Sequence, residues 1–177
     1  MPDATGLELI AQRVRESLGD EAVVGTQYYR EQATLQVAPG SVRDVLTHFR
    51  DTDPEPYERL MSVHGCDYLP EEPRLGVHYE LLSTDRCERL RVKTRLTVEQ
   101  AETEGLPSIV EIYPGAEFHE REVFDFFGVV FSGHPDLRRI AMPEDYVGHP
   151  QRRDFPMGGE EVLFTFNEHE LPRWYDK

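Results

Sequence analysis

Residues 88–97 read ERLRVKTRLT, and this stretch decides the fold class because its two faces have opposite character. Every second side chain is apolar or Thr on one face and cationic on the other: Leu90, Val92, Thr94 and Leu96 against Arg91, Lys93 and Arg95. This period of two predicts a β-strand with one buried face. We interpret the cationic face as solvated or paired within the chain rather than as a binding site.

The flanking sequence supplies the other elements of a layered domain. Two more strands are predicted at 59–65 and 76–83, and a hairpin at 22–38. Apolar residues at helical spacing predict amphipathic helices over 6–18 and 42–51. The fold class that follows is α+β, with two layers: a mixed, roughly five-stranded sheet with helices on one face. An extended helix-and-turn C-terminal segment follows the sheet.

Local signals refine these elements. Ser41 is predicted to cap the helix over 42–51, with Asp44 as the reciprocal acid. His48 lies off the apolar stripe of that helix and is predicted to be a surface histidine. The acidic residues 98–106 are predicted to form a loop, and 107–112 a short helical segment that ends before a proline.

The 177 residues are predicted to form one domain with two regions: a sheet region, 1–113, and a helix, turns and tail, 114–177.

The composition of the chain excludes several classes of protein. The net charge of −15 should repel nucleic acid and anionic lipid. Cys66 and Cys87 are too few for an iron–sulfur cluster, which needs about four ligands. With no leader and no stretch of about 20 apolar residues, we expect a cytosolic protein that reaches a membrane only through other proteins.

Charged and aromatic residues are densest in residues 117–156, EFHEREVFDFFGVVFSGHPDLRRIAMPEDYVGHPQRRDFP, which we call the motif segment. Its first part is predicted to be helical over 115–127, ending at a glycine. Three charged residues at i, i+4 spacing should line up as an acid–base–acid column: Glu117, Arg121 and Asp125. Two turns then share the sequence Gly-His-Pro, at 133–135 and 148–150.

Several enzymatic interpretations are possible for these residues. A stand-alone metal-dependent hydrolase could draw its ligands from three histidines and three carboxylates: His119, His134, His149, Glu120, Glu122 and Asp125. The sequence holds no HExxH pair, and two of those histidines precede prolines in turns. The two glutamates are two residues apart on a helix and face different directions, which disfavours acid–base catalysis by that pair. Cys66 beside His64 lacks an orienting third group.

Glutamates, arginines and aromatics held on a helix and rigid turns are typical of a protein–protein contact, where buried charges must be paired. We therefore expect no catalytic, cofactor-binding or metal residues here. The candidate partner-binding residues are Glu117, Glu120, Arg121, Glu122, Asp125, His134, Asp136, Arg138, Arg139, His149, Arg152, Arg153 and Asp154.

Several runs of the motif segment resemble the 30 kDa subunit of NADH:quinone oxidoreductase, the family also called the C subunit of respiratory complex I (NDH-1). These runs are 120–122 (ERE), 125–128 (DFFG), 131–140 (FSGHPDLRRI), 148–150 (GHP) and 152–156 (RRDFP). The strands over 60–96 and Asp67-Tyr68 fit the looser pattern of the family, while the N-terminal third matches only in predicted elements. Ala141, Gln151 and Arg153 depart from its usual residues.

The resemblance implies a five-stranded α/β fold and a place in the hydrophilic arm of the complex, on the cytoplasmic side of a bacterial cell membrane. The implied partner is the large quinone-site subunit, of the D or 49 kDa type. The resemblance also implies that FMN and iron–sulfur clusters in partner subunits carry electrons from NADH to quinone, coupled to proton pumping, and that this chain holds no redox centre. Hydrogenase-related, complex-I-like assemblies carry relatives of this subunit and remain an alternative.

Overall fold

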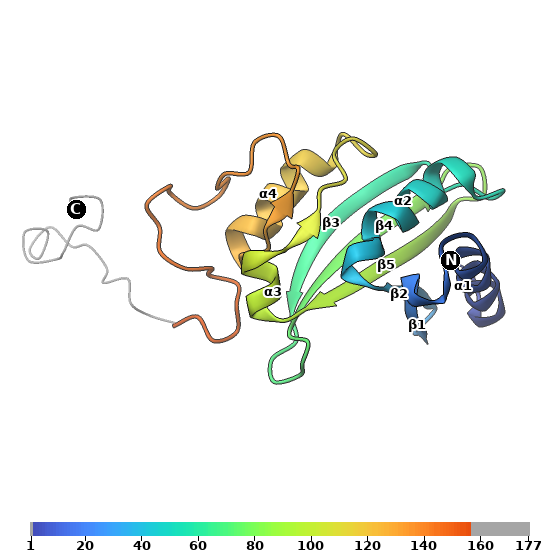
Figure 1. The fold of residues 1–177 in the computed structure, drawn as a ribbon, viewed down its shortest axis with the longest axis horizontal. Helices are drawn as coiled ribbons and strands as arrows, with labels where there is room; N and C mark the ends of the chain where they lie inside the picture. The colour runs from blue at the N-terminus through green and yellow to red at the C-terminus, as the bar shows by residue number, and fades with distance from the viewer. Residues whose placement is uncertain (1, 157–177) are drawn as a thin grey trace, which may run out of the picture.

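The fold was analysed on a computed structural model that describes residues 2–156. The elements in order are α1 (Ala4–Leu18), β1 (Val23–Tyr29), β2 (Gln32–Val37), α2 (Val42–Thr47), β3 (Arg59–Asp67), β4 (Leu75–Ser83), β5 (Glu88–Leu96), α3 (Val98–Thr103), β6 (Leu106–Pro107), α4 (Ala116–Phe127) and β7 (Phe131–Ser132). Figure 1 shows α1 and α4 at opposite ends of the sheet, with α2 between them. The predicted fold class, α+β with a mixed five-stranded sheet, is confirmed.

The sheet has the order β1-β2-β5-β4-β3. Two antiparallel units, the hairpin β1–β2 and the meander β3–β4–β5, meet at one parallel pair between β2 and β5, where Leu35 faces Val92. The parallel pair needs a crossover, which the chain makes through α2. The predicted alternation of β5 is confirmed on its apolar face, because Leu90, Val92 and Leu96 are buried. On the cationic face Arg91 and Arg95 pair with carboxylates as predicted, but Lys93 is buried and, within residues 2–156, forms no ion pair.

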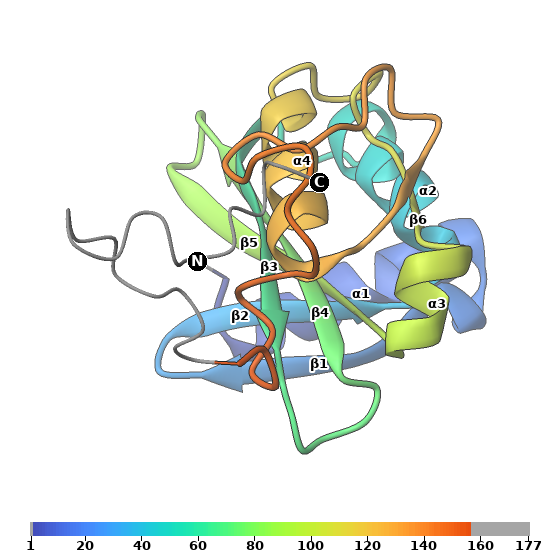
Figure 2. The same ribbon diagram turned by 90° about the vertical axis from the view of Figure 1, so that its left-hand side faces the viewer.

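The hydrophobic core lies between one face of the sheet and the helices. Helix α1 packs on β1 and β2, and α4 packs on β3. Side chains from α4, such as Val123 and Phe127, belong to the same buried cluster as Leu7 of α1. The sheet and the helical part of the motif segment therefore share one core. Figure 2 views the ribbon from the end that carries α4.

Gly65 of β3 gives Phe127 its place against the sheet. A Cβ at position 65 would lie 2.3 Å from the Phe127 ring, so the ring would have to move out of the core. We expect Gly65→Ala to lower the free energy of unfolding by about 1–3 kcal/mol, as overpacking does. Chemical denaturation followed by circular dichroism measures this change.

A second substitution tests the cause. Phe127→Ala removes all three ring atoms that the new Cβ would meet, so the cost of Gly65→Ala should be smaller in the Phe127→Ala background than in the wild type. Equal costs in both backgrounds would mean that the ring is not the obstacle.

Two local predictions between β5 and α4 are wrong. Residues 98–103 form helix α3 instead of a loop, because Thr97 and Gln100 make a capping box whose two hydrogen bonds satisfy the helix start. The region over 107–112 forms β6 and turns instead of a helix. There the amides of Leu106 and Ser108 donate to the carbonyls of Val130 and Ser132 (each 2.9 Å), and this pairing with β7 keeps the start of the region extended.

His48 is buried, not on the surface. The chain after α2 widens into a π-helical turn, His48–Thr52, which brings Asp53 next to the ring. Its Nε2 lies 3.5 Å from a carboxylate oxygen of the buried Asp53. Ser41 precedes α2 as predicted, but its side chain makes no capping hydrogen bond. Within residues 2–156, no helix is long and apolar enough to span a membrane.

Candidate functional site

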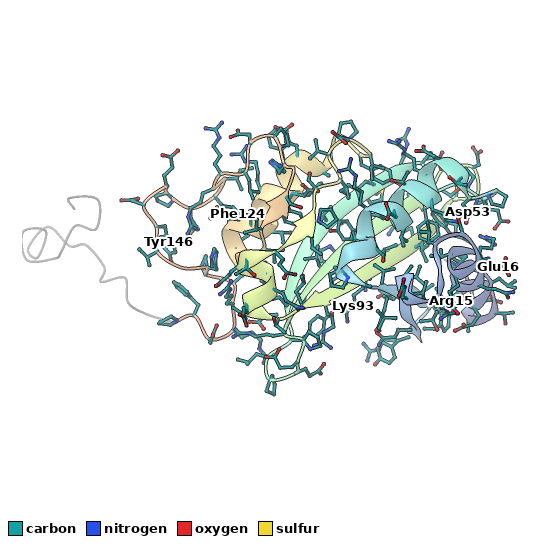
Figure 3. All side chains as sticks on the ribbon, viewed as in Figure 1. Arg15, Glu16, Asp53, Lys93, Phe124 and Tyr146 are labelled. Atoms are coloured by element: carbon teal, nitrogen blue, oxygen red, sulfur yellow. The ribbon has the colours of Figure 1, made fainter. Side chains whose placement is uncertain are left out.

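The motif segment lies at the end of the molecule opposite α1 (Figure 1). Figure 3 labels Phe124 and Tyr146 at this end, and Arg15 and Glu16 at the other. Helix α4 covers its first part, and Gly128 ends the helix in the left-handed conformation, as predicted. Over residues 133–156, which follow β7, the structure shows no helix or strand, so side chains must hold this part in place.

Arg121 fixes the turn that follows β7. Its Nε and Nη2 donate to the backbone carbonyls of Arg138 and Arg139, each at 3.1 Å. Within residues 2–156, Arg121 forms no ion pair with Glu117 or Asp125, so the predicted acid–base–acid column does not act as one. The three residues share the helix, but each contacts a different part of the motif segment.

Asp125 is the main anchor of residues 139–142. One carboxylate oxygen accepts three backbone N–H groups, from Ile140, Ala141 and Met142, at 2.8–3.0 Å. The other accepts Arg139 Nη1 at 2.6 Å. Burial alone would raise the pKa of this carboxyl, but these hydrogen bonds outweigh it and hold the pKa below its usual range. Asp125 is thus a buried, ionised group whose lone pairs are all directed at one loop.

Arg139 extends this network through its remaining donors. Its Nη2 donates to the carbonyls of Tyr146 (2.9 Å) and Gly148 (3.0 Å). Its Nη1 also donates to the Asp125 carbonyl (3.3 Å), so this guanidinium serves one carboxylate and three carbonyls, one acceptor more than the three donors of a lysine could. Arg139 therefore ties the first Gly-His-Pro region to the second.

Glu120 and His134 lie together on the other side of α4. The fully buried Glu120 carboxylate accepts Ser108 Oγ (2.7 Å) and the Ile109 amide (2.8 Å). Burial raises its pKa, while those two hydrogen bonds favour the ionised form. His134 Nδ1 accepts the Asp136 amide, so Nε2 carries the proton and donates to the Glu117 carbonyl at 3.0 Å.

The close of the motif segment is fixed to the loop between β3 and β4. Arg74 forms a bidentate ion pair with the buried Asp67 (2.8 and 2.6 Å) and also binds Asp154 (2.8 Å). Asp67 in turn accepts the Arg153 amide at 2.7 Å. The Arg74 guanidinium, with these amides, holds the pKa of Asp67 well below its usual range, despite burial.

At Gly128 the end of α4 packs against the second half of the motif segment. Its φ is +73°, and a Cβ there would lie 2.4 Å from Arg152 and 2.5 Å from His149. Arg152 donates to the Phe127 carbonyl (2.8 Å) and His149 Nδ1 to the Asp125 carbonyl (3.0 Å). These side chains satisfy carbonyls at the end of α4 that have no partner inside the helix.

The candidate partner-binding residues thus divide into two groups. The first group is used inside the chain through buried or half-buried side chains: Glu120, Arg121, Asp125, His134, Arg139, His149 and Arg152. The second group is exposed: Glu122, Asp136, Arg138, Arg153 and Asp154. Glu117 is half-buried. The first group holds the motif segment in place. The second group and the exposed apolar side chains near it therefore form the outer surface of the motif segment.

That surface carries three large apolar side chains in contact with solvent: Phe118, Ile140 and Val147. Val147 is 87% exposed and Phe118 59%. The sequence did not indicate these residues, because their exposure depends on how the turns lie on α4. Arg74, Asp67 and Ser108 were also missed, since the pairing of Arg74 with Asp154 spans 80 residues and leaves no local signal.

The histidines and carboxylates considered for metal binding do not converge. Within residues 2–156, no group of three or more His, Cys, Asp or Glu side chains could hold a metal ion. His134 and His149 each donate to a backbone carbonyl instead.

The fold and the site define a class of protein: an α+β domain whose last helix carries a long irregular segment, fixed by buried ion pairs. The profile of the family described as "Respiratory-chain NADH dehydrogenase, 30 Kd subunit" matches residues 35–161. The chain belongs to this family, whose members are the C subunits of the NADH-quinone oxidoreductase called complex I.

Individual relatives extend the match over nearly the whole chain. The chain is 44% identical over 163 residues to the C subunit of NADH-quinone oxidoreductase from Roseiflexus castenholzii, covering 92% of this chain and 91% of the relative. It is 39% identical to the corresponding subunit from Methylobacterium sp. (strain 4-46), over 92% of this chain and 74% of the relative. Two departures noted in the sequence leave the anchors intact, because Ala141 and Gln151 contribute backbone amides.

Proposed function

We propose that the chain is a non-redox structural subunit in the hydrophilic arm of a proton-pumping NADH:quinone oxidoreductase. It docks on the quinone-site subunit, of the D or 49 kDa type, and so supports electron transfer from NADH to quinone. The observation that carries this proposal is the construction of the motif segment. Buried ion pairs on Asp125 and Arg74 hold an irregular ribbon rigid, and that ribbon exposes Phe118 and Val147 beside charged groups. Aromatic and aliphatic anchors with arginines nearby are what stable interfaces use.

The proposal includes what the chain does not do. FMN and iron–sulfur clusters belong to partner subunits. This chain has a structural role in the complex and holds no redox centre. The chain then sits on the cytoplasmic side of the bacterial cell membrane through the complex alone, and it binds no nucleic acid.

The direct test is co-purification of the tagged full chain from native membranes. The expected result is recovery with the other complex I subunits, with the quinone-site subunit retained longest as salt is raised. Flavin or metal bound in stoichiometric amount to the chain purified alone would contradict the proposal. So would recovery without any other subunit.

Charges placed on the exposed apolar side chains should weaken docking without unfolding the chain. We expect Phe118→Glu and Val147→Glu each to lower incorporation into the complex roughly tenfold, because a charge would have to be buried in the interface. Incorporation is measured as the ratio of variant to wild-type chain in the purified complex after co-expression.

The matched control is Leu9→Glu. Leu9 is 55% exposed on α1, at the opposite end of the molecule, so this variant should be incorporated like the wild type. Equal losses for all three variants would point to unfolding, and no loss in any would remove the motif segment as the docking surface.

A further inference from the structure

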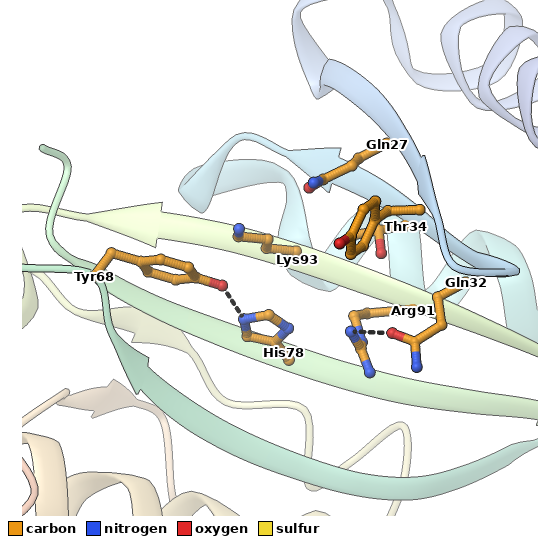
Figure 4. Close-up of a pocket in the computed structure, with 8 residues that line it drawn as sticks. Gln27, Gln32, Thr34, Tyr68, His78, Arg91 and Lys93 are labelled. Atoms are coloured by element: carbon orange, nitrogen blue, oxygen red, sulfur yellow. Dashed lines mark hydrogen bonds between the residues drawn. The ribbon is translucent and has the colours of Figure 1, made fainter. Parts of the chain in front are cut away.

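The face of the sheet away from the helices carries a hollow of its own. About 190 Å³ in volume, it is lined by side chains from β1, β2, β4 and β5 and from the loop after β3. Figure 4 shows Tyr68, His78, Arg91 and Lys93 around it, with Gln27 and Thr34 across from them. None of these residues belongs to the motif segment, and the proposed function does not use them.

Lys93 is the unusual member of this group. The chain has only two lysines, Lys93 and Lys177, against 17 arginines. Lys93 is 7% exposed, and lysine is almost never so buried unless it is paired. Its two neighbours on the strand have acids, Arg91 with Glu80 and Arg95 with Glu71. Within residues 2–156, no carboxylate forms an ion pair with Lys93 itself.

The surroundings of Lys93 are fixed before any partner arrives. Its Nζ lies 4.1 Å from the centre of the Tyr68 ring, and Tyr68 Oη is 2.9 Å from His78 Nε2. The ring can lie flat there because Gly76 has no side chain: a Cβ would come within 2.6 Å of it. Burial, with His64 and Lys93 nearby, lowers the pKa of His78 to about 3, so this histidine adds no charge.

A buried cation among other cations is costly, so the charge needs an anion. Burial and the neighbouring Arg95 both lower the pKa of Lys93, which is the direction expected for an ammonium that lacks a counter-charge. Arg95 adds two donors, Nε and Nη2, that have no acceptor within residues 2–156. Lys93 thus lines the hollow with a second cation beside it and no carboxylate of residues 2–156 paired to it.

We propose that this face is a second docking surface, in which an aspartate or glutamate of a neighbouring subunit enters the hollow beside Lys93. Charge complementarity selects the occupant. A single carboxylate fits a hollow of this size, and the amides of Gln27 and Gln32 and the hydroxyl of Thr34 lie in its wall. A nucleic acid would meet the net charge of −15 on the rest of the chain, so an acidic protein segment is the partner.

The scarcity of lysine makes a sharp test available. A carbodiimide joins an amine to a carboxylate without a spacer, and within residues 2–156 Lys93 offers the only lysine amine. Applied to the purified complex, it should link Lys93 to an acidic residue of another subunit. Links from Lys93 only to carboxylates of this same chain, such as Glu71 or those of residues 157–177, would overturn the proposal.

Substitution gives an independent readout. Lys93→Met keeps the length of the side chain and removes its charge, so the Tm of the isolated full chain should not fall, because an unpaired buried charge is lost. In the complex, the ratio of variant to wild-type chain should drop about thirtyfold, the loss expected when one partner of a buried ion pair is removed. Arg43→Met, which removes an exposed charge paired with Glu111 on the helix side, should change neither measurement.

The outcomes separate this proposal from the proposed function. If Phe118→Glu and Val147→Glu lower incorporation while Lys93→Met does not, the second surface is refuted and docking through the motif segment stands. If Lys93→Met lowers incorporation and Tm together, its role is in folding and the second surface is likewise refuted. If the wild-type chain does not enter the complex, both proposals fail.

Discussion

Asp125→Ala should release residues 139–142 from helix α4 and lower the free energy of unfolding by about 3–5 kcal/mol, the cost of removing one partner of a buried ion pair. Four hydrogen bonds end on this carboxylate, three of them from backbone amides. Without it, the Arg139 guanidinium keeps three carbonyl acceptors but loses its counter-charge. Urea denaturation of the wild type and the variant measures the difference.

The control for Asp125→Ala is Asp136→Ala. Asp136 is exposed and pairs with Arg138, whose side chain is 62% exposed, so this change should cost less than about 1 kcal/mol. A similar cost for both variants would show that the Asp125 carboxylate is not an anchor.

Acid provides a second check on Asp125. Its folded pKa lies below the unfolded value of about 3.9, so its contribution to stability is complete above that pH. The contribution is lost as the pH falls through the folded pKa. The stability difference between wild type and Asp125→Ala should therefore be constant from pH 7 to 5 and shrink below pH 4. A difference that grew on acidification would reverse the assigned shift.

Arg74→Ala should cost about 3 kcal/mol of stability and free the end of the motif segment. The guanidinium pairs with Asp67, whose side chain is 1% exposed, and reaches across to Asp154. Its removal leaves the Asp67 charge buried with only backbone amides as partners. Because Asp154 is exposed, Asp154→Ala should cost less than about 1 kcal/mol.

The effect of Arg74→Ala on the motif segment can be separated from its effect on stability. Limited proteolysis under native conditions should cut the chain between residues 143 and 156 faster in Arg74→Ala than in Arg43→Ala, which removes an exposed pair elsewhere. An unchanged cleavage pattern would mean that Arg74 stabilises the sheet loop without holding the motif segment.

The sheet could be predicted from the sequence because its strands alternate buried and exposed residue types. In β5 the alternation of Leu90, Val92 and Leu96 with cations gives both the element and its orientation. Helix α4 was equally clear from its apolar stripe and the glycine that ends it. The capping box of Thr97 and Gln100 was also present in the sequence, but the acidic composition of 98–106 led to the prediction of a loop instead of α3.

The rest of the site depends on contacts that leave no local trace. Nothing in the spacing of Arg121 distinguishes a carboxylate partner on its own helix from the carbonyls of Arg138 and Arg139, which it contacts. His48 was predicted to be exposed from its helical phase, but the π-helical turn that follows brings Asp53 next to its ring, which the spacing of α2 does not indicate. The motif was therefore located from the sequence, while its internal and exposed side chains could be told apart only in three dimensions.

The single parallel pair between β2 and β5 has a consequence for how the chain moves. Leu35 meets Val92 across 57 residues of sequence, whereas the hairpin and the meander on either side close through short turns. Non-local pairings carry a larger loop-closure cost than hairpins, so we expect the sheet to separate at this boundary when it opens locally. Amide exchange should then report the hairpin β1–β2 as a separately opening unit. Because the hollow takes Gln27 and Thr34 from that hairpin and Lys93 from β5, each opening would dismantle the hollow while the motif segment stays closed.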